Sequence, residues 1–281
     1  MRIGMNLLLW TAGATEEHFG LLGDIRGWGY DSVELPMFAP NGSPWPLLAS
    51  KLDDLGLART AVTVATPEAN PISDNPAVRR AGTDHLKACI DSCVTLGADV
   101  LCGPVYSPVG GLVGRGRTEE EWEWAVTALR EAGEHAAGAG VILGVEPLNR
   151  FETYFLNSAQ DSSSLIDAVG LPSVGILFDT FHANIEEKDP IGAIGVAGRR
   201  IAHFHVSEND RSTPGEGHIP WRQVFNALKA TGYDGSLTVE AFGRALPELA
   251  AATCIWRQMF PSEEHLAKAA NRFIRDMWSA A

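Results

Sequence analysis

The sequence has no apolar run long enough to cross a lipid bilayer, which takes about 20 residues in a helix. The apolar segment at its start, residues 1–10, is short, carries one basic residue and lacks a small-residue cleavage site. We therefore expect a first β-strand there instead of a signal peptide. These absences predict a cytoplasmic protein with no membrane partner.

Basic residues are also scarce. The chain of 281 residues has 22 Lys and Arg against 35 Asp and Glu, which gives a formal net charge of -13. Proteins that bind nucleic acids usually present a basic face to the phosphates, and no segment here has that character. We therefore expect no nucleic-acid partner.

Only four cysteines are present. Cys89 and Cys93 are four residues apart in a helical stretch, so they share one face, as a metal-binding or redox pair would. Small buried side chains in a reducing compartment are the better interpretation of this pair, and of Cys102 and Cys254.

What the sequence does contain is a regular alternation of β-rich runs and helical stretches. Eight strand–helix units of about 35 residues fit a single-domain (β/α)8 TIM barrel over residues 1–281, since such barrels take ~250 residues. A doubly wound sheet would also alternate in this way, but the glycine-rich phosphate fingerprint after its first strand is missing. The predicted strands are Ile3–Leu9, Ser32–Glu34, Arg59–Val64, Val100–Cys102, Val141–Glu146, Val174–Asp179, Ile201–Val206 and Ser236–Glu240. The predicted helices include Glu16–Trp28, Pro46–Leu55, Pro76–Leu96, Glu119–Ala139, Ala159–Val169, Trp221–Thr231 and Glu263–Trp278.

Four successive predicted strands end on a side chain that can bind a metal ion: Glu146, Asp179, His205 and Glu240. They are separated by about one strand–helix unit each, so they should lie side by side at the mouth of the barrel, where active sites of this fold are built. One such residue alone would be interpreted as a solvated strand end or half of a salt bridge. Four together predict a metal site, because a charge that ends an apolar strand is costly to bury unpaired.

Three carboxylates and one imidazole make an oxygen-rich site that suits Mn²⁺ or Mg²⁺, with Co²⁺ able to substitute. Zinc is less favoured, since its sites usually contain more His or Cys. Further polar residues follow the ligands along the chain: Glu152, His182 and Arg211. His203 shares a strand face with His205, and we expect it to support the site or the core.

Five segments of the C-terminal half resemble the ketose 3-epimerases of the D-tagatose 3-epimerase and D-psicose (allulose) 3-epimerase group, within the xylose isomerase-like barrel superfamily. The N-terminal third resembles this family only in the order of its strands and helices. The matching segments are Glu146–Glu152 (EPLNRFE), Phe178–Glu187 (FDTFHANIEE), His203–His205 with Arg211 and Pro214–Gly217, Gly232–Gly235 (GYDG), and Val239–Phe242 (VEAF).

The resemblance implies a site with one divalent ion, most often Mn²⁺, otherwise Mg²⁺ or Co²⁺, and no organic cofactor. It implies that Glu146 and Glu240 are the catalytic acid–base pair as well as metal ligands. It also implies that Glu152, His182 and Arg211 bind the ketose near its carbonyl group. Asp210, immediately before Arg211, stands where the family pattern leads us to expect Asn. This difference affects the contacts expected of the loop that carries Arg211, but not the expected chemistry.

By the same resemblance, the expected reaction is C3 epimerisation of free 2-ketoses through a cis-enediolate. The expected pairs are D-tagatose with D-sorbose and D-fructose with D-psicose, together with ketopentoses such as ribulose and xylulose. A homo-oligomer, either a dimer or a tetramer, is expected as well. Trp10, Glu34, Tyr106 and Phe242 are candidate neighbours of the substrate tail, although packing in the core is the better explanation for each aromatic residue.

The alternative on the same metal site is an aldose–ketose or hydroxypyruvate-type isomerase, which moves a proton between C1 and C2. An inosose-type dehydratase would eliminate water from a similar site. An endonuclease-like barrel would need more His and Asp ligands and a basic surface. A barrel that only binds sugar would have lost one of the two glutamates, and both are present.

Overall fold

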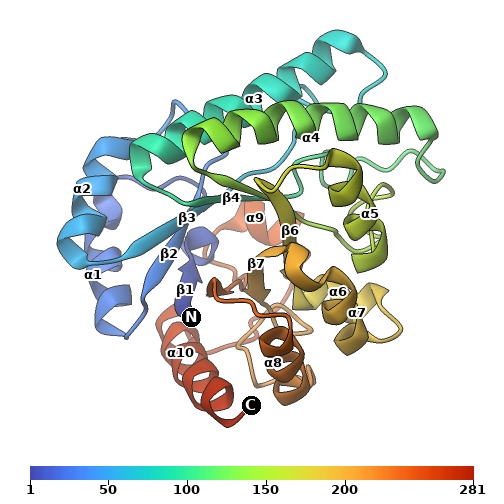
Figure 1. Cartoon of the computed structure of the whole chain (residues 1–281). Helices are drawn as coiled ribbons and strands as arrows, with labels where there is room; N and C mark the ends of the chain where they lie inside the picture. Colours follow the sequence, from blue (N-terminus) through green and yellow to red (C-terminus); the bar gives the residue numbers. More distant parts are fainter.

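Eight parallel strands close into one barrel in chain order, with β1 paired to β8, and helices surround it (Figure 1). The computed structural model describes all residues from 1 to 281. The predicted TIM barrel is therefore confirmed. The strands are β1 (Arg2–Asn6), β2 (Ser32–Pro36), β3 (Ala58–Val62), β4 (Val100–Gly103), β5 (Ile142–Val145), β6 (Val174–Asp179), β7 (Ile201–Val206) and β8 (Ser236–Val239).

The predicted helices are present, and their ends mostly agree within a few residues. Four of them end on a glycine in the left-handed conformation: Gly56, Gly97, Gly140 and Gly170. The helices are α1 (Phe19–Gly27), α2 (Trp45–Leu55), α3 (Pro76–Leu96), α4 (Glu119–Ala139), α5 (Ala159–Val169), α6 (Thr180–Glu186), α7 (Pro190–Ala197), α8 (Trp221–Ala230), α9 (Pro247–Ala252) and α10 (Glu263–Ala280). Short 3₁₀ helices are η1 (Leu7–Leu9), η2 (Glu16–His18) and η3 (Gly198–Arg200).

The first strand was predicted too long. It ends at Asn6, and Leu7–Leu9 form η1. The side chain of Asn6 accepts a hydrogen bond from the backbone N–H of Leu8 and so caps the 3₁₀ turn. Leu7–Leu9 are apolar because η1 is buried like the strand before it. Hydrophobicity alone therefore does not show where the strand ends and the 3₁₀ helix begins.

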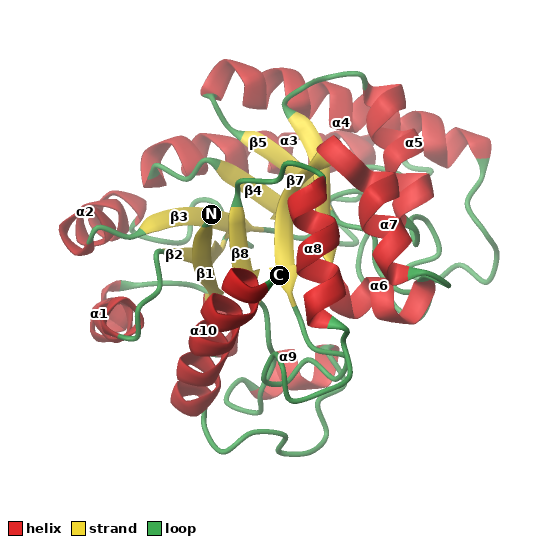
Figure 2. Cartoon of the chain, turned by 60° about the horizontal axis from the view of Figure 1, so that its bottom comes forward, coloured by secondary structure: helices red, strands yellow, loops and turns green.

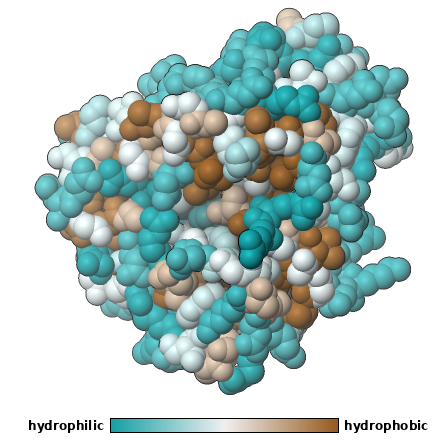
Figure 3. Space-filling view, viewed as in Figure 1, coloured by the Kyte–Doolittle hydropathy of each residue, from teal (hydrophilic) through white to brown (hydrophobic).

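One hydrophobic core of 62 buried residues joins the barrel to its helices, so no boundary divides the chain. Cys89 and Cys93 are buried in it, and Cys102 is buried in a smaller cluster of eight residues, as expected, whereas Cys254 is exposed, contrary to the prediction. No cysteine is paired. Figure 3 shows the face seen in Figure 1, on which hydrophobic residues form separate patches among hydrophilic ones.

The carboxyl ends of the strands carry the longer loops, and α9 lies at this end, below β1 and β8 in Figure 2. Close packing extends to the strand ends. Gly103, the last residue of β4, has φ 130°, and a Cβ there would lie 2.1 Å from the carbonyl oxygen of Thr63. Only glycine fits this position, which lies beside the end of β5. No helix is both long and apolar enough to span a membrane.

Candidate functional site

The structure brings the four predicted metal ligands together at the carboxyl end of the barrel. Glu146 directly follows β5, Asp179 ends β6, His205 lies in β7, and Glu240 directly follows β8. One ligand atom from each lies within 4.8 Å of the other three, and all four side chains are buried. The arrangement follows from the fold, because each chain segment contributes the same end of its strand.

The imidazole of His205 presents one nitrogen to the other ligands. Its Nδ1 lies 3.4 Å from Oε1 of Glu240 and 3.6 Å from Oδ2 of Asp179. This atom is buried and has no hydrogen-bond partner. A buried nitrogen that is unpartnered among carboxylates is unusual in a folded protein, and a bound cation would satisfy it.

Asp179 is held rigidly because it ends a strand and starts a helix at once. Its Oδ1 accepts hydrogen bonds from the backbone N–H groups of Phe181 and His182, as the N-cap of α6. Its Oδ2 accepts a hydrogen bond of 2.6 Å from the hydroxyl of Ser207. Both oxygens are thus oriented by the protein.

Burial shifts the pKa values of the carboxyl groups in the cluster. Burial raises the pKa of Glu146 well above its usual range, and the negative charge of Glu240 raises it further. Burial also opposes ionisation of Asp179, but His205, His182 and the hydroxyl of Ser207 together outweigh it and keep the pKa of that carboxyl low. Neighbouring carboxylates that repel one another in a buried site would be neutralised by a divalent cation.

The three predicted substrate-binding residues form a second group beside the ligands. Nη2 of Arg211 lies 3.3 Å from Oε1 of Glu152 and 3.1 Å from Nε2 of His182, and this Nε2 lies 3.6 Å from Oε1 of Glu146. Burial lowers the pKa of His182 to about 4, so the imidazole is neutral near pH 7. Its Nδ1 accepts the backbone N–H of Asn149 at 3.0 Å, which leaves the proton on Nε2.

Arg211 has an unusual backbone and a tightly enclosed side chain. Its φ is 61°, a left-handed conformation that non-glycine residues seldom adopt. The guanidinium lies between two rings, 4.1 Å from the centroid of Phe181 and 4.8 Å from that of Phe242. Its Nε is buried without a partner. Such a conformation at a functional site indicates that the loop is built to aim this side chain.

A cavity of about 270 Å³ opens between the two groups. Glu146 and Glu240 line it, as do Glu152, His182 and Arg211, whereas Asp179 and His205 do not. The two glutamates therefore face both the ligand cluster and the open space. Most of the remaining wall is apolar and includes Leu8, Phe38, Val62, Val64, Val109 and, from α9, Leu249.

The other candidate neighbours of the substrate separate into two sets. Phe242 lines the cavity, but Trp10, Glu34 and Tyr106 do not. Asp210 also lies away from the cavity wall, and its Oδ1 accepts hydrogen bonds from the backbone and hydroxyl of the residue two positions later. The unexpected Asp therefore shapes the loop that carries the arginine.

Three polar residues that support the site were not predicted from the sequence. Asn6 donates to Oε1 of Glu240 at 3.3 Å, Ser207 donates to Asp179, and Asn149 binds both Glu152 and His182. Asn6 ends an apolar strand, so the rule that selected the four ligands would also have selected it. Ser207 and Asn149 lie in polar loops, where composition carries no such signal.

The residues present fit a divalent metal ion. Three carboxylates and an unpartnered imidazole nitrogen supply hard oxygen and borderline nitrogen donors within one small, buried volume. No thiolate belongs to this set.

Comparison with known proteins agrees with the geometry. The sequence pattern of the family described as "Xylose isomerase-like TIM barrel" matches residues 22–277. A ketose 3-epimerase of Arthrobacter globiformis is 31% identical, over 100% of this chain and 98% of that protein.

Solved structures give the same result. A structure of L-ribulose 3-epimerase has a TM-score of 0.94 at 31% identity and covers 99% of this chain and 95% of its own. D-allulose 3-epimerase from Methylomonas sp., solved in complex with D-allulose, has a TM-score of 0.93 at 26% identity and covers 99% and 97%. The chain therefore belongs to the xylose isomerase-like TIM barrel family and, within it, to the ketose 3-epimerases, which are isomerases.

Proposed function

We propose that this protein epimerises free 2-ketoses at C3, with Glu146 and Glu240 as the acid–base pair and one divalent cation held by Glu146, Asp179, His205 and Glu240. The observation that carries the assignment is that, of the four clustered side chains, the two glutamates alone also line the cavity. A sugar in that cavity meets two carboxylates that come from strands on different sides of the barrel mouth.

Inversion at C3 requires that a proton leave one face of the carbon and that another arrive on the opposite face. Two acid–base groups on opposite sides of the carbon do this without rotating the sugar. One glutamate removes the proton as a carboxylate while the other delivers a proton as a carboxylic acid. The reverse reaction exchanges these roles, so the pair titrates as a coupled unit.

His182 and Arg211 bind the carbonyl end of the ketose. The Nε2–H of His182 and the Nη2 of Arg211 are both donors, and they approach to 3.1 Å. Two donors at this distance are satisfied by an acceptor that both can reach, and a sugar oxygen provides one. Glu152, held by Asn149, accepts a hydrogen bond from a hydroxyl group of the substrate.

The cation is Mn²⁺, which Mg²⁺ or Co²⁺ can replace, because the donor set is rich in carboxylate oxygen. When bound, it supplies a Lewis acid that stabilises the negative charge developing on the substrate oxygens as the C3 proton leaves. No organic cofactor is needed, since the reaction transfers only protons.

The substrates are ketopentoses and ketohexoses, among them ribulose, D-fructose, D-psicose and D-tagatose. Relatives described as L-ribulose 3-epimerase and as D-allulose 3-epimerase in complex with D-allulose support this class. The apolar wall opposite the polar group makes few hydrogen bonds to the sugar tail, which is compatible with both chain lengths.

The protein also assembles as a dimer or tetramer and resides in the cytoplasm. Self-association is supported by large apolar side chains that are exposed on loops at the carboxyl end of the barrel: Leu112, Val113, Phe151 and Trp256. Sedimentation equilibrium at several concentrations tests the oligomeric state.

The absence of any paired cysteine supports a reducing compartment.

Exchange in D₂O distinguishes this function from the aldose–ketose isomerase. D-Fructose incubated with the enzyme and Mn²⁺ should give D-psicose that carries deuterium at C3, with no aldose. An isomerase would give an aldose labelled at C1 or C2, because it moves a proton between those carbons. NMR of the mixture identifies the labelled carbon, and an aldehyde product without label at C3 would reject the epimerase.

A further inference from the structure

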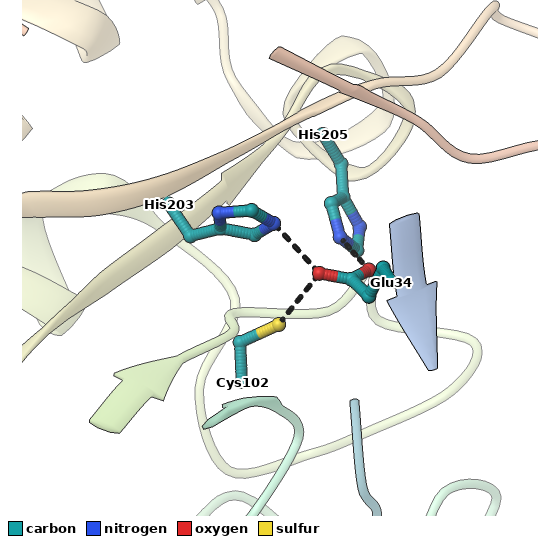
Figure 4. A group of neighbouring side chains, drawn as sticks. All are labelled: Glu34, Cys102, His203 and His205. Carbon is teal, nitrogen blue, oxygen red and sulfur yellow. Dashed lines mark hydrogen bonds and ion pairs between the residues drawn. The ribbon is translucent and has the colours of Figure 1, made fainter. Parts of the chain in front are cut away.

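Glu34 is a fully buried carboxylate at the centre of a second polar cluster, which shares His205 with the proposed cation site (Figure 4). It belongs to β2, on the opposite half of the barrel from β6 and β7. Polar side-chain atoms of five residues lie close to its two oxygens. Oε1 is 2.9 Å from Nδ2 of Asn6 and 2.7 Å from Nε2 of His205. Oε2 is 2.8 Å from the hydroxyl of Thr60, 2.7 Å from Nε2 of His203 and 3.4 Å from Sγ of Cys102.

This second cluster is not a metal site of its own, although it contains a carboxylate, two imidazoles and a thiol. Ligand atoms around one ion at bond lengths of ~2.1 Å are separated by more than 3 Å. Both imidazole nitrogens instead lie 2.7 Å from Glu34, a distance that leaves room for a proton and not for a metal. The oxygens of Glu34 are also already occupied by Asn6 and Thr60.

The contact with His205 determines which ring nitrogen carries the proton. Nε2 of His205 faces a carboxylate oxygen that can only accept, so the proton lies on Nε2. In the neutral ring, which is the form that binds a metal ion, Nδ1 then has the free lone pair, and this is the atom that lies unpartnered near Glu240 and Asp179. The orientation of the ring and the tautomer both follow from Glu34.

We propose that Glu34 is a positioning residue of the metal site, which holds His205 in the Nε2–H tautomer and aims its Nδ1 at the cation. Asn6 extends this effect, because its amide donates to Glu34 and to Glu240 and so links the buried carboxylate to one catalytic glutamate. The inference rests on the proposed metal site, but it is independent of which sugar reacts. Carboxylates that accept the second N–H of a ligating histidine typically contribute a factor of 10–100 to metal affinity.

The test measures Mn²⁺ binding to the chelator-treated full-length protein by calorimetry, in the absence of sugar. Glu34→Gln should weaken the affinity about 10- to 100-fold. The glutamine cannot restore the contacts, since its amide would turn donors toward Thr60 or His205. Glu34→Asp keeps the charge and should recover part of the affinity.

Glu208→Gln is the matched control. Glu208 is another fully buried glutamate with several N–H donors, from the backbone of Gly215 and Ile219 and the indole of Trp221, and it contacts none of the four ligands. It should lower thermal stability comparably while leaving Mn²⁺ affinity within about threefold of the wild type. Equal losses of affinity in both variants would overturn the proposal, because they would show a general effect on folding.

A measurement on the unmodified chain covers the case in which Glu34→Gln fails to fold. Long-range ¹H–¹⁵N spectra of the Mg²⁺-loaded protein report the protonated nitrogen of each histidine, with His205 assigned by difference from His205→Asn. A proton on Nε2 is expected, and a proton on Nδ1 overturns the proposal. If the wild type binds no divalent cation, the proposed metal site itself fails. If it binds Mn²⁺ with Glu34-dependent affinity but does not epimerise ketoses, the inference about Glu34 stands alone.

Discussion

Individual side chains around the cavity differ in whether they face the ligand cluster, the cavity or both, and we assign their roles from this difference. Glu146 and Glu240 face both the ligand cluster and the cavity, so each is assigned two functions. Replacing either with Gln keeps the shape and one oxygen donor but removes the proton-transfer group. We expect turnover to fall at least 10²–10⁴-fold, the usual contribution of general acid–base catalysis.

Steady-state kinetics at saturating Mn²⁺, with metal content measured on the same samples, checks this prediction. Glu121→Gln is the control, since Glu121 lies at the start of α4 and does not line the cavity. Near wild-type kcat in either site variant with metal bound would show that the proton path is misassigned.

We propose that Arg211 acts on the substrate and not on the metal. Its guanidinium is stacked between Phe181 and Phe242 and contacts none of the four ligands directly by hydrogen bond. Arg211→Ala should lower kcat/KM on the order of 10- to 100-fold, as expected for the loss of a charged hydrogen bond of about 1.5–3 kcal/mol. Arg211→Lys should rescue little, because Lys lacks the planar fork that fits between the rings.

Metal content and a thermal unfolding curve accompany the kinetics of both Arg211 variants. Retained metal and a retained cooperative transition are expected. Loss of the metal, or of the folded state, would make Arg211 a structural residue.

At the scale of the element, strand ends were the most informative feature of the sequence. Strands β6 and β7 agree with their predicted bounds, because their apolar runs stop at polar residues of the site. Helices α6 and α7 were missed, since seven or eight residues are too few to show a helical period. Helix α9, which borders the cavity, was missed for the same reason.

The contacts between elements were less predictable than the elements. Alternation of strands and helices places Glu34 on an early strand and His205 on a late one, but only closure of the barrel makes them neighbours. Sequence order alone therefore identified residues at the mouth from the last four strands. Among the first four strands it missed Asn6, and it named Glu34 only as a candidate neighbour of the substrate tail. Closure depends on packing between distant segments, which has no local signal.

The start of α4 provides a prediction at this scale. Thr118 and Glu121 form a capping box. The backbone N–H of Thr118 donates to the carboxylate of Glu121, and the backbone N–H of Glu121 donates to the hydroxyl of Thr118. The carboxylate also accepts hydrogen bonds from Arg115 and Tyr154. Burial would raise the pKa of Glu121, but hydrogen bonds from Arg115, Thr118 and Tyr154 together outweigh it and lower the pKa below its ordinary value of 4.5. Glu121→Gln should destabilise the protein on the order of 1–2 kcal/mol at pH 7.

The sign of the pH dependence follows from the lowered pKa. A carboxyl whose pKa is lower in the folded state contributes stability above pH 4.5, and this contribution is lost as the pH falls through the folded-state value. The difference in unfolding free energy between wild type and Glu121→Gln should therefore shrink below pH 4.5. Urea titrations at pH 7 and pH 4 measure it, and a difference that grows in acid would contradict this account.

At the scale of the whole molecule, the four proposed ligands come from four consecutive strands, so a bound cation would connect half of the barrel. The buried carboxylates repel one another: burial is the main cause of the raised pKa of Glu146, and the negative charge of Glu240 raises that pKa further. A ligand that binds only the folded state stabilises it by mass action, by ~2.7 kcal/mol at a hundredfold excess over Kd. Since each kcal/mol shifts Tm by roughly 2–4 °C in domains of this size, Mn²⁺ should raise Tm by about 5–10 °C over the chelated protein.

Removal of the metal should therefore have two consequences with one cause. Dialysis against a chelator should abolish epimerisation and lower Tm, and Mn²⁺, Co²⁺ or Mg²⁺ should restore both. In Asp179→Asn the effect of Mn²⁺ on Tm should be much smaller, because this variant loses the charge of a ligand that does not line the cavity. Calorimetric scans with elemental analysis measure the coupling between stability and metal. Full turnover by protein shown to be free of metal would reject the metal-dependent mechanism. If Mn²⁺ does not change the Tm of an enzyme that is active and contains metal, only the proposed stabilisation of the folded barrel by the ion is rejected.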